Sequence, residues 1–471
     1  MAAGTGERPQ RQLRAALLLA AGMVTGVAVA AAPATHAEWG ANGGDDGNNG
    51  WDNDWEDNGW DDDPWGDEEA GGLPFELSGF AELAGGYRTR DHELFDKRYH
   101  LAEARLRLEA RGDWRRFDYR VRADAVADGV TDELRGELRE ARLSFPVGER
   151  LDMRLGRQVL AWGTGDLLFI NDLFPKDFQS FLTGRDEDYL QGPSDAVRGT
   201  WYGEQVTLDL VWTPLFAPDT YPEGERLSYF NPRSGEQVVD RLRAEEPDDF
   251  PNDGELAAQL RTRIGGTELA GYFYRGFFPQ PGSVTEADRL THGRLNAFGA
   301  SLRDRLGPGI VNAEIGYYHS VDYDSSAPQR APNSEARLLL GYTWEAITHL
   351  DVGLQYYVEW LQEYDELKAA WQGDENLDNA QEDDYRPDEF RHLLTARLTY
   401  SMWRDNLTAS LFTFYSPSDN DYYLRPSLRY RASDALTYSL GGNFFGGDHA
   451  HTFFGQFTED SNLYARLRYR F

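Results

Sequence analysis

Arginine recurs at every second position in several segments of this 471-residue chain, most plainly in the closing stretch SNLYARLRYRF. Arg466, Arg468 and Arg470 alternate there with Leu467 and Tyr469. A guanidinium group is always charged and matches carboxylate, sulfate or phosphate oxygens through paired hydrogen bonds. The stretch therefore predicts either a basic aromatic tail that binds nucleic acid or a β-strand with one arginine-bearing face.

The overall composition weighs against nucleic acid and favours strands. The net charge is -33, and a polyanion repels phosphate and gains nothing from counterion release. Aromatic residues make up 13% of the chain and glycine is abundant, which is typical of a strand-rich protein. Cysteine is absent, so the chain has no disulfide, zinc-thiolate site or thiol nucleophile. We therefore expect no nucleic-acid partner.

Apolar and polar residues alternate with period two through most of the sequence after Leu73. In LDVGLQYYVEW, for example, Leu350, Val352 and Leu354 share one face while Asp351 and Gln355 share the other. The pattern predicts eighteen strands, at 75–89, 99–112, 117–127, 134–146, 151–162, 195–203, 206–216, 255–264, 267–278, 295–306, 309–320, 335–345, 348–361, 390–402, 406–416, 422–432, 436–447 and 461–471.

The connections between these segments alternate between short and mostly longer ones. The long ones include 163–194, 217–254 and 362–389. An even strand count, strands near ten residues and this alternation are typical of an outer-membrane barrel with short periplasmic turns and long outer loops. We therefore predict an all-β fold over 73–471, an antiparallel transmembrane β-barrel of about eighteen strands, in the outer membrane of a Gram-negative bacterium and surrounded by its lipid.

If one strand face meets lipid, the other shows what the lumen is made of. The uncharged face carries sets such as Leu338, Leu340, Tyr342 and Trp344. The opposite face carries eighteen arginines. Twelve of these are the candidate anion contacts: Arg105, Arg107, Arg120, Arg122, Arg154, Arg261, Arg263, Arg397, Arg429, Arg466, Arg468 and Arg470. The other six are Arg111, Arg142, Arg337, Arg391, Arg425 and Arg431.

The same face carries ten carboxylates: Glu103, Glu109, Asp118, Asp124, Glu140, Asp152, Glu255, Glu335, Asp351 and Glu359. Some arginines must pair with them across adjacent strands, which needs no function. The surplus predicts a positive lumen that favours anions. It is densest at Arg425–Arg431 and Arg466–Arg470, whose strands lack a carboxylate on that face.

The N-terminal region has the layout of an export signal. Arg8, Arg11 and Arg14 precede an apolar run that ends near small residues, which predicts a signal peptide over 1–37. The stretch 38–72 is rich in Asp, Gly and spaced tryptophans, with no basic residue, and we expect it to be disordered. It is either a plain linker or, through its spaced tryptophans, a docking segment for a periplasmic partner or a calcium-responsive segment.

The segment around the fifth and sixth strands resembles a known family. LGRQ at 155–158 and SDAVR at 194–198 look like motifs of the alginate-export family of outer-membrane porins. The resemblance implies eighteen strands, an arginine-rich constriction and passage of an anionic polysaccharide. It adds Arg157, Asp195 and Arg198 to the substrate-binding candidates. The acidic prelude and the long acidic loops depart from this pattern.

The long connection at 163–194 is too apolar to extend into water, because it contains stretches such as DLLFINDLF. We expect it to fold inward, either as a constriction or as a plug packed against the wall. A constriction would place Asp166, Asp172, Lys176 and Arg185 near the path of the solute.

The sequence contains no GxSxG, no P-loop and no HExxH motif, so none of these motifs indicates an enzyme. His449 and His451 beside Asp448 lack a fixed third ligand, so we predict no metal centre and no cofactor there. The terminal Phe471 resembles the signature by which the barrel-assembly machinery recognises its clients. We predict a porin for an anionic solute or acidic polysaccharide. The alternative is a non-conducting structural or adhesion barrel whose acidic loops bind Ca²⁺.

Overall fold

A computed structural model of the chain describes residues 75–231, 235–240, 242–285, 287, 289–327, 330–373 and 387–471. The predicted signal peptide (1–37) and the acidic segment (38–72) lie outside these residues.

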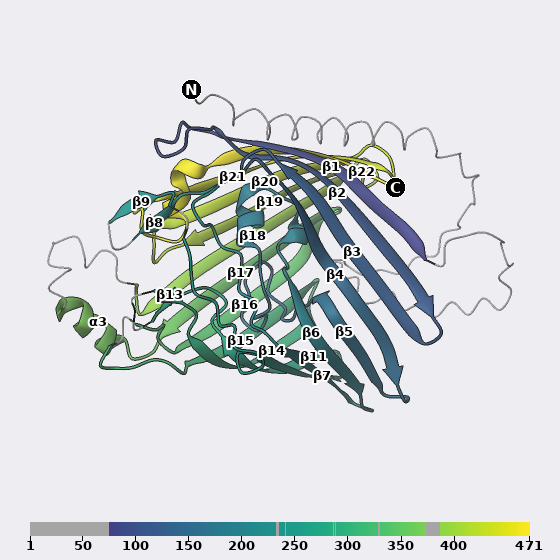
Figure 1. The fold of residues 1–471 in the computed structure, drawn as a ribbon, viewed down its shortest axis with the longest axis horizontal. Helices are drawn as coiled ribbons and strands as arrows, with labels where there is room; N and C mark the ends of the chain where they lie inside the picture. Colours follow the sequence, from purple (N-terminus) through teal and green to yellow (C-terminus); the bar gives the residue numbers. More distant parts are fainter. Residues whose placement is uncertain are drawn as a thin grey trace, which may run out of the picture.

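Eighteen antiparallel strands form one closed barrel (Figure 1). They are β1 (Glu76–Arg88), β2 (Tyr99–Trp114), β3 (Phe117–Asp128), β4 (Glu133–Val147), β5 (Leu151–Val159), β6 (Pro193–Tyr202), β7 (Val206–Thr213), β10 (Glu255–Ile264), β11 (Thr267–Phe277), β14 (Arg294–Leu306), β15 (Gly309–Ser320), β16 (Glu335–Ile347), β17 (Leu350–Leu361), β18 (Phe390–Met402), β19 (Leu407–Ser416), β20 (Asp421–Arg431), β21 (Leu436–Gly447) and β22 (Asn462–Arg470). The predicted all-β barrel of eighteen strands is confirmed.

The last strand closes the barrel against the first. β22 pairs with β1 from Phe80 opposite Arg470 to Arg88 opposite Asn462. Because every strand then has two neighbours, all backbone donors and acceptors along the wall can be satisfied, as a hydrocarbon environment requires. The closing stretch that first suggested a basic tail is therefore a wall strand.

Tight turns join the strands at one end of the barrel, and mostly longer loops join them at the other (Figure 1). The turns use left-handed residues, including Arg115, Gly148 and His349, which match the twist of paired strands. The long-loop end carries α3 (Tyr364–Gly373), η4 (Gly455–Asp460) and two small hairpins. These hairpins are β8 (Tyr229–Asn231) with β9 (Glu236–Val238) and β12 (Ser283–Val284) with β13 (Leu290–Thr291).

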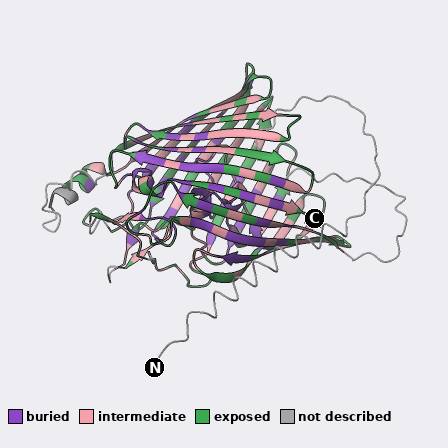
Figure 2. Ribbon diagram, turned by 90° about the horizontal axis from the view of Figure 1, so that it is seen from above, coloured by how far each residue is buried: buried purple, intermediate pink, exposed green. Residues whose placement is uncertain are grey.

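Exposure alternates along the strands (Figure 2). Large apolar side chains on the outer face stay exposed, for example Leu440 at 56% and Ile315 at 55%. Inward side chains such as Leu339 and Tyr423 are fully buried. A water-filled lumen would leave these inward residues accessible, so something inside the barrel covers them. No helix among the described residues is long and apolar enough to cross a membrane.

Candidate functional site

The connection between β5 and β6 folds back into the barrel. It contains α2 (Phe178–Thr183), whose N-cap Asp177 accepts a 2.7 Å hydrogen bond from the Ser180 amide, and the short 3₁₀ turn η1 (Glu187–Tyr189). Gly184 ends α2 at φ 86°, and a Cβ at this position would overlap the ring of Tyr464 on β22. The helix end therefore lies directly against the barrel wall.

Apolar side chains hold this inward loop in place. One buried cluster joins loop residues with inward residues from many strands: Leu167, Leu168, Ile170, Phe174, Phe181, Leu182 and Leu190 with Ala196, Val211, Ala257, Tyr274, Tyr318, Leu339, Tyr357, Leu393, Phe412 and Tyr423, among others. Burial of this kind contributes about 1.5–3 kcal/mol for each large apolar side chain. The predicted inward fold of the loop is what the structure shows.

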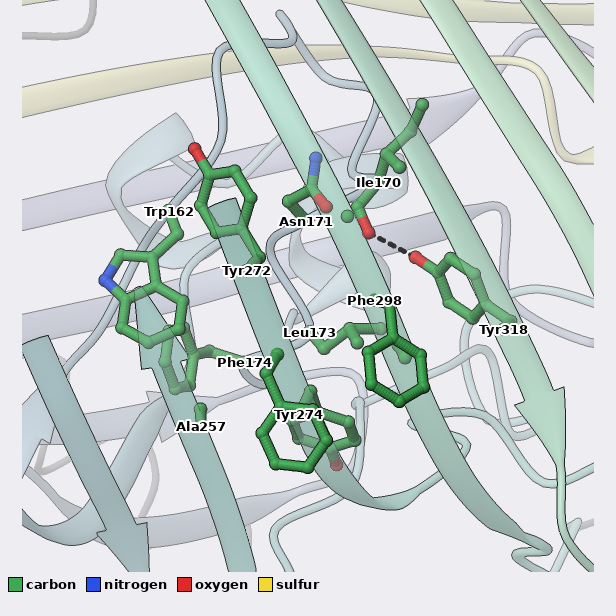
Figure 3. A pocket seen from close by; sticks show the side chains of 13 residues that line it. Trp162, Ile170, Asn171, Leu173, Phe174, Ala257, Tyr272, Tyr274, Phe298 and Tyr318 are labelled. Atoms are coloured by element: carbon green, nitrogen blue, oxygen red, sulfur yellow. Dashed lines mark hydrogen bonds between the residues drawn. The ribbon is translucent and has the colours of Figure 1, made fainter. Parts of the chain in front are cut away.

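Figure 3 shows one edge of this packing, a small apolar pocket between the loop and β11, β14 and β15. Trp162 and Phe174 meet edge to face, with ring centroids 4.9 Å apart, and Tyr318 donates a hydrogen bond to the carbonyl of Ile170. The Asn171 amide donates at 2.8 Å to Glu314 of β15. The loop backbone is thus bonded directly to lumen side chains.

Two acidic residues at the start of η1, its N-cap Asp186 and its first residue Glu187, pair with arginines of the last strands. Asp186 accepts hydrogen bonds from Arg466 at 2.6 Å, and Arg468 lies 3.1 Å from the same carboxylate oxygen. Glu187 pairs with Arg425. Burial alone would raise the pKa of Asp186, but the charges of Arg466 and Arg468 hold it well below its usual range. These arginines are therefore neutralised by the loop.

Two further loop residues make buried or partly buried ion pairs. Asp166 accepts from Arg397 of β18 at 2.5 and 2.8 Å, in a bidentate geometry. Arg185 donates to Glu103 of β2 at 3.0 Å. The loop is consequently anchored on β2 and β18, which lie on different parts of the wall. Both residues were predicted to lie near the path, and both bond to side chains that face the lumen.

Lys176 and Asp172 pair inside the loop itself, 3.0 Å apart, with both side chains almost fully buried. The Lys176 amide also donates at 2.7 Å to Asp219 from the connection between β7 and β10. Burial raises the pKa of Asp219 to about 6. These residues join two long loops and are not exposed to an open channel.

A set of arginines lies toward the short-turn end of β2 to β6. In register, Arg111 is opposite Arg120, and Arg120 is opposite Arg142. Arg154 is likewise opposite Arg198. We call these five residues the arginine wall. Like charges directly opposite one another in a sheet are destabilising, so this arrangement concentrates positive potential on one side of the lumen.

Only part of that charge is balanced. Glu109 lies 3.2 Å from Arg120 and 2.9 Å from Arg122. Asp209 of β7 pairs with Arg198 at 3.0 Å and with Arg261 at 3.2 Å. Arg142 donates at 3.3 Å to the Ser144 hydroxyl, and within the described ranges no carboxylate lies within 4 Å of it.

The remaining predicted arginines have varied surroundings. Arg105 and Arg107 both bond to Asp124 at 2.7 Å and are buried beside Tyr189 of the loop. Among the others, Arg263 pairs with Glu268, and Arg470 donates a hydrogen bond to the Thr437 hydroxyl at 3.2 Å. Arg429 is exposed on the inward face of β20.

Arg157 and Asp195 require a correction. They are register partners, 3.2 Å apart, on the face of β5 and β6 that also carries Leu155 and Val197. This is the lipid-facing side, and the two side chains are 37% and 66% exposed. The alternation places Arg157 on the same face as Leu155, whereas the motif resemblance predicts a place in the substrate path. This pair is therefore left out of the substrate path, while Arg198 faces the lumen.

The prediction that the arginine surplus is densest on the last strands is also wrong, because carboxylates from β1 and the loop pair with these arginines. Glu82 of β1 accepts from Arg468 at 2.8 Å, and the loop supplies Asp186 and Glu187 for its neighbours. The alternation of Glu82 with Ala81 and Leu83 is a sequence signal that places Glu82 on the lumen face. The loop carboxylates gave no periodic signal.

The outer mouth is closed in part by the connection between β7 and β10. Arg226 is buried there and donates at 3.0 Å to the His100 carbonyl, besides pairing with Asp128. Arg88 pairs with Asp460 at 3.0 Å. The ring centroids of His449 and His451 lie 5.2 Å apart, and no group of three or more potential metal ligands is found in the part of the chain that the structure describes.

No protein-family model and no curated protein matches the sequence. Among solved structures, OccAB3 of Acinetobacter baumannii is 10% identical, covers 84% of this chain and 99% of its own, and has a TM-score of 0.51. OccK2 (OpdF) of Pseudomonas aeruginosa, in complex with glucuronate, is 11% identical over 84% of this chain and 97% of its own, also with a TM-score of 0.51. This likeness shows the fold of an outer-membrane porin barrel. The narrower resemblance to the alginate-export family stays a prediction.

Proposed function

We propose that the protein is an outer-membrane channel for small anionic solutes, which pass along the arginine wall. The observation that carries the proposal is the register of that wall, where Arg120 faces Arg142 and Arg154 faces Arg198. A barrel gains no stability from placing like charges opposite one another. An anion that enters the lumen relieves this repulsion, so the arrangement favours anions over cations.

The loop carboxylates support this path because they neutralise arginines on the other side of the lumen. Asp166, Asp186 and Glu187 bond to arginines of β18, β20 and β22. Positive charge on the arginine wall lacks an equivalent set of partners at Arg142. The loop thus cancels charge where it is anchored. A solute that passes β2 to β6 meets the arginine wall, where the described residues place no carboxylate within 4 Å of Arg142.

The acidic character of the whole chain does not oppose this reading. Connections such as 217–254 carry ten acids and four arginines. Their field is screened over about 10 Å at 0.1 M salt, whereas charges inside a narrow lumen are screened much less. Selectivity is therefore governed by the residues that the solute passes within a few ångströms.

A small carboxylate is the favoured solute class. The structure of OccK2, a barrel of the same fold, holds glucuronate, a sugar that carries one carboxylate. Here the inward loop takes up lumen volume, which leaves less room for a polymer than for a monomeric sugar acid. A guanidinium fork binds a carboxylate in the bidentate geometry it also adopts with Asp166.

Uptake into proteoliposomes tests the proposal. Liposomes with the folded protein should swell faster in glucuronate than in an iso-osmotic solution of glucose, which has nearly the same size and no charge. Arg142→Glu should reverse or abolish this preference, whereas Arg116→Glu, in a short turn outside the lumen, should keep it. Equal swelling rates in the two sugars would refute a charge-selective path.

The second candidate is a non-conducting structural or adhesion barrel. The dense packing of Ile170, Phe174 and Phe181 within the lumen favours it, because a loop held this firmly could act as a plug. We propose Ca²⁺ binding by the acidic outer loops as part of this alternative. Folded protein that produces no swelling in either sugar, with or without Ca²⁺, would favour the plug.

A further inference from the structure

Three adjacent strands carry polar and basic side chains on the outer face, near the long-loop end. Register places Arg275 of β11 opposite Asn296 of β14, and Asn296 opposite His319 of β15. Neighbouring strands lie about 4.8 Å apart, so Arg275 and His319 are separated by about 10 Å. Arg294 lies two residues further out on the same face of β14. We call these four residues the rim patch.

The orientation of the rim patch follows from its neighbours. Arg275 is the register partner of Leu256, which is 44% exposed on the lipid-facing side of β10. Tyr274, the residue before Arg275, is buried on the lumen side. Arg275 therefore points away from the lumen, as does His319, which alternates with buried Tyr318.

The charges of the rim patch are weakly satisfied by the protein. Arg275 and His319 are exposed, and neither has a hydrogen bond or ion pair to any residue that the structure describes. Arg294 reaches Asp253 at 3.5 Å with a half-exposed side chain. Exposed pairs of this kind contribute about 0–1 kcal/mol, so Arg294 also remains available to an outside ligand.

The aromatic residues just below indicate the depth of the rim patch. Phe273, Phe298 and Tyr317 form the next row on the same three strands, and the rings of Phe273 and Phe298 are 5.4 Å apart. Rows of aromatic residues mark the membrane interface in outer-membrane barrels. Two residues along a tilted strand rise about 5 Å, so the rim patch lies at the level of lipid headgroups.

On β1, β5, β6, β17 and β18 the outer face near the long-loop end is uncharged or self-neutralised. Trp360 and Phe390 stack there on β17 and β18, and Tyr87 projects from β1. On β5 and β6 the charges of Arg157 and Asp195 cancel each other. A surplus of positive charge therefore distinguishes the face of β11, β14 and β15 from the outer face of those other strands.

We propose that the rim patch binds the phosphate groups of an anionic lipid in the outer leaflet. The Arg275 guanidinium is suited to paired hydrogen bonds with phosphate oxygens, and Asn296 and His319 supply further donors. The aromatic row below packs against the first carbons of the acyl chains. A phosphorylated glycolipid fits best, because two phosphates can engage Arg275 and His319 across the intervening strand. The site depends on the barrel's lying in an outer membrane and not on conduction.

Native mass spectrometry of the full-length protein in neutral detergent tests this site. The probes are bisphosphorylated lipid A and the same glycolipid with both phosphates removed. Only the phosphorylated form should give a retained adduct, and Arg275→Gln with His319→Gln should weaken its binding about tenfold. Arg157→Gln removes a charge from the same rim outside the patch and should leave binding unchanged.

Three results would overturn the proposal. They are equal retention of the dephosphorylated lipid, an equal loss in Arg157→Gln, and displacement of lipid A by millimolar inorganic phosphate, which would indicate a site for soluble phosphate. Heat-modifiable migration on a gel verifies that each variant is folded. If the double variant does not fold, Arg275→Gln alone is compared with Arg275→Lys. The latter keeps the charge and should retain more binding, and equal binding by the two would also refute the site.

Discussion

Arg466 of the last strand donates a 2.6 Å hydrogen bond to Asp186, which lies 280 residues earlier in the inward loop. The terminal strand therefore does two things at once. Its outer face meets lipid through residues such as Leu463, and its inner face anchors the loop that narrows the lumen. Arg466 is therefore a positioning residue for the loop.

Breaking this anchor should change both conductance and stability. Asp186→Asn leaves Arg466 and Arg468 buried beside a neutral side chain, which costs about 3–5 kcal/mol for a buried pair. We expect a lower Tm and larger, noisier single-channel currents. Asp195→Asn, which breaks an exposed pair on the outer face, is the control and should resemble the wild type. Identical behaviour of the two variants would contradict the anchoring role of Asp186.

The apolar contacts of the loop should contribute independently of its charges. Phe181 is buried, meets Tyr423 edge to face at 5.8 Å and lies under the Arg425 guanidinium. Phe181→Ala should lower the unfolding free energy by about 3–5 kcal/mol. Phe453→Ala, at a 40% exposed position, should cost under about 1 kcal/mol. Thermal unfolding in detergent compares them, and equal shifts would mean that the loop is not packed as described.

The contact between the two long loops should depend on pH. Burial raises the pKa of Asp219 to about 6, so its protonated form is favoured in the folded protein. The associated stability is present below the ordinary aspartate pKa and is lost as pH rises from about 4 to about 6, by roughly 3 kcal/mol at most. Asp219→Asn should remove this decline and unfold at a higher temperature than the wild type at pH 7.5.

The control for that experiment is Asp91→Asn, at an exposed position where the side chain is 88% accessible. Its Tm should follow the wild type at every pH. A wild-type Tm that does not change between pH 4 and pH 7 would contradict the burial of an ionisable Asp219. Protonation of Asp186, which would weaken its pairs with Arg466 and Arg468, should occur only at a lower pH, because the pKa of Asp186 is held below its usual value.

Charge on the arginine wall should set ion selectivity. Arg142→Gln removes a cation that has no carboxylate within 4 Å among the described residues. A unit charge at about 4 Å changes an ion's energy by about 1 kcal/mol or more, so the anion-to-cation permeability ratio should fall about fivefold. Arg116→Gln makes the same charge change in a short turn and should leave the ratio unaltered. A ratio that falls equally in both variants would point to a general surface effect.

The strands were predictable because a wall between lipid and lumen imposes a strict period of two. LDVGLQYYVEW at 350–360 shows the pattern, and β17 covers Leu350–Leu361. The same periodicity predicted that these arginines face the lumen, and the register that places Arg120 opposite Arg142 agrees with it. The alternation of residue types along the chain was sufficient to predict this part of the fold.

Partners of the loop could not be read in this way, because a loop has no period and its contacts cross the lumen. Asp186 and Arg466 are joined only by the three-dimensional path of residues 160–192. The apolar composition of the loop did predict that it folds inward. It could not show which arginines the loop neutralises. The sequence therefore predicts unpaired charge at Arg466 and Arg468, which the folded protein balances with Asp186 and Glu82.

Arg157 and Asp195 show the opposite error. Their periodicity with Leu155 and Val197 indicated the lipid face, but a motif resemblance placed them in the lumen. In a barrel wall the alternation is a physical requirement, since a one-residue shift moves a side chain to the other face. In assigning a side chain to a face, alternation is therefore stronger evidence than a short motif.

The reversal potential of the purified protein in a planar bilayer, measured across a KCl gradient, tests the central claim most directly. A channel lined by the arginine wall should show single-channel steps and a reversal potential whose sign reports preference for chloride over potassium. A reversal potential of the opposite sign, or the absence of steps from protein shown to be folded, would contradict it.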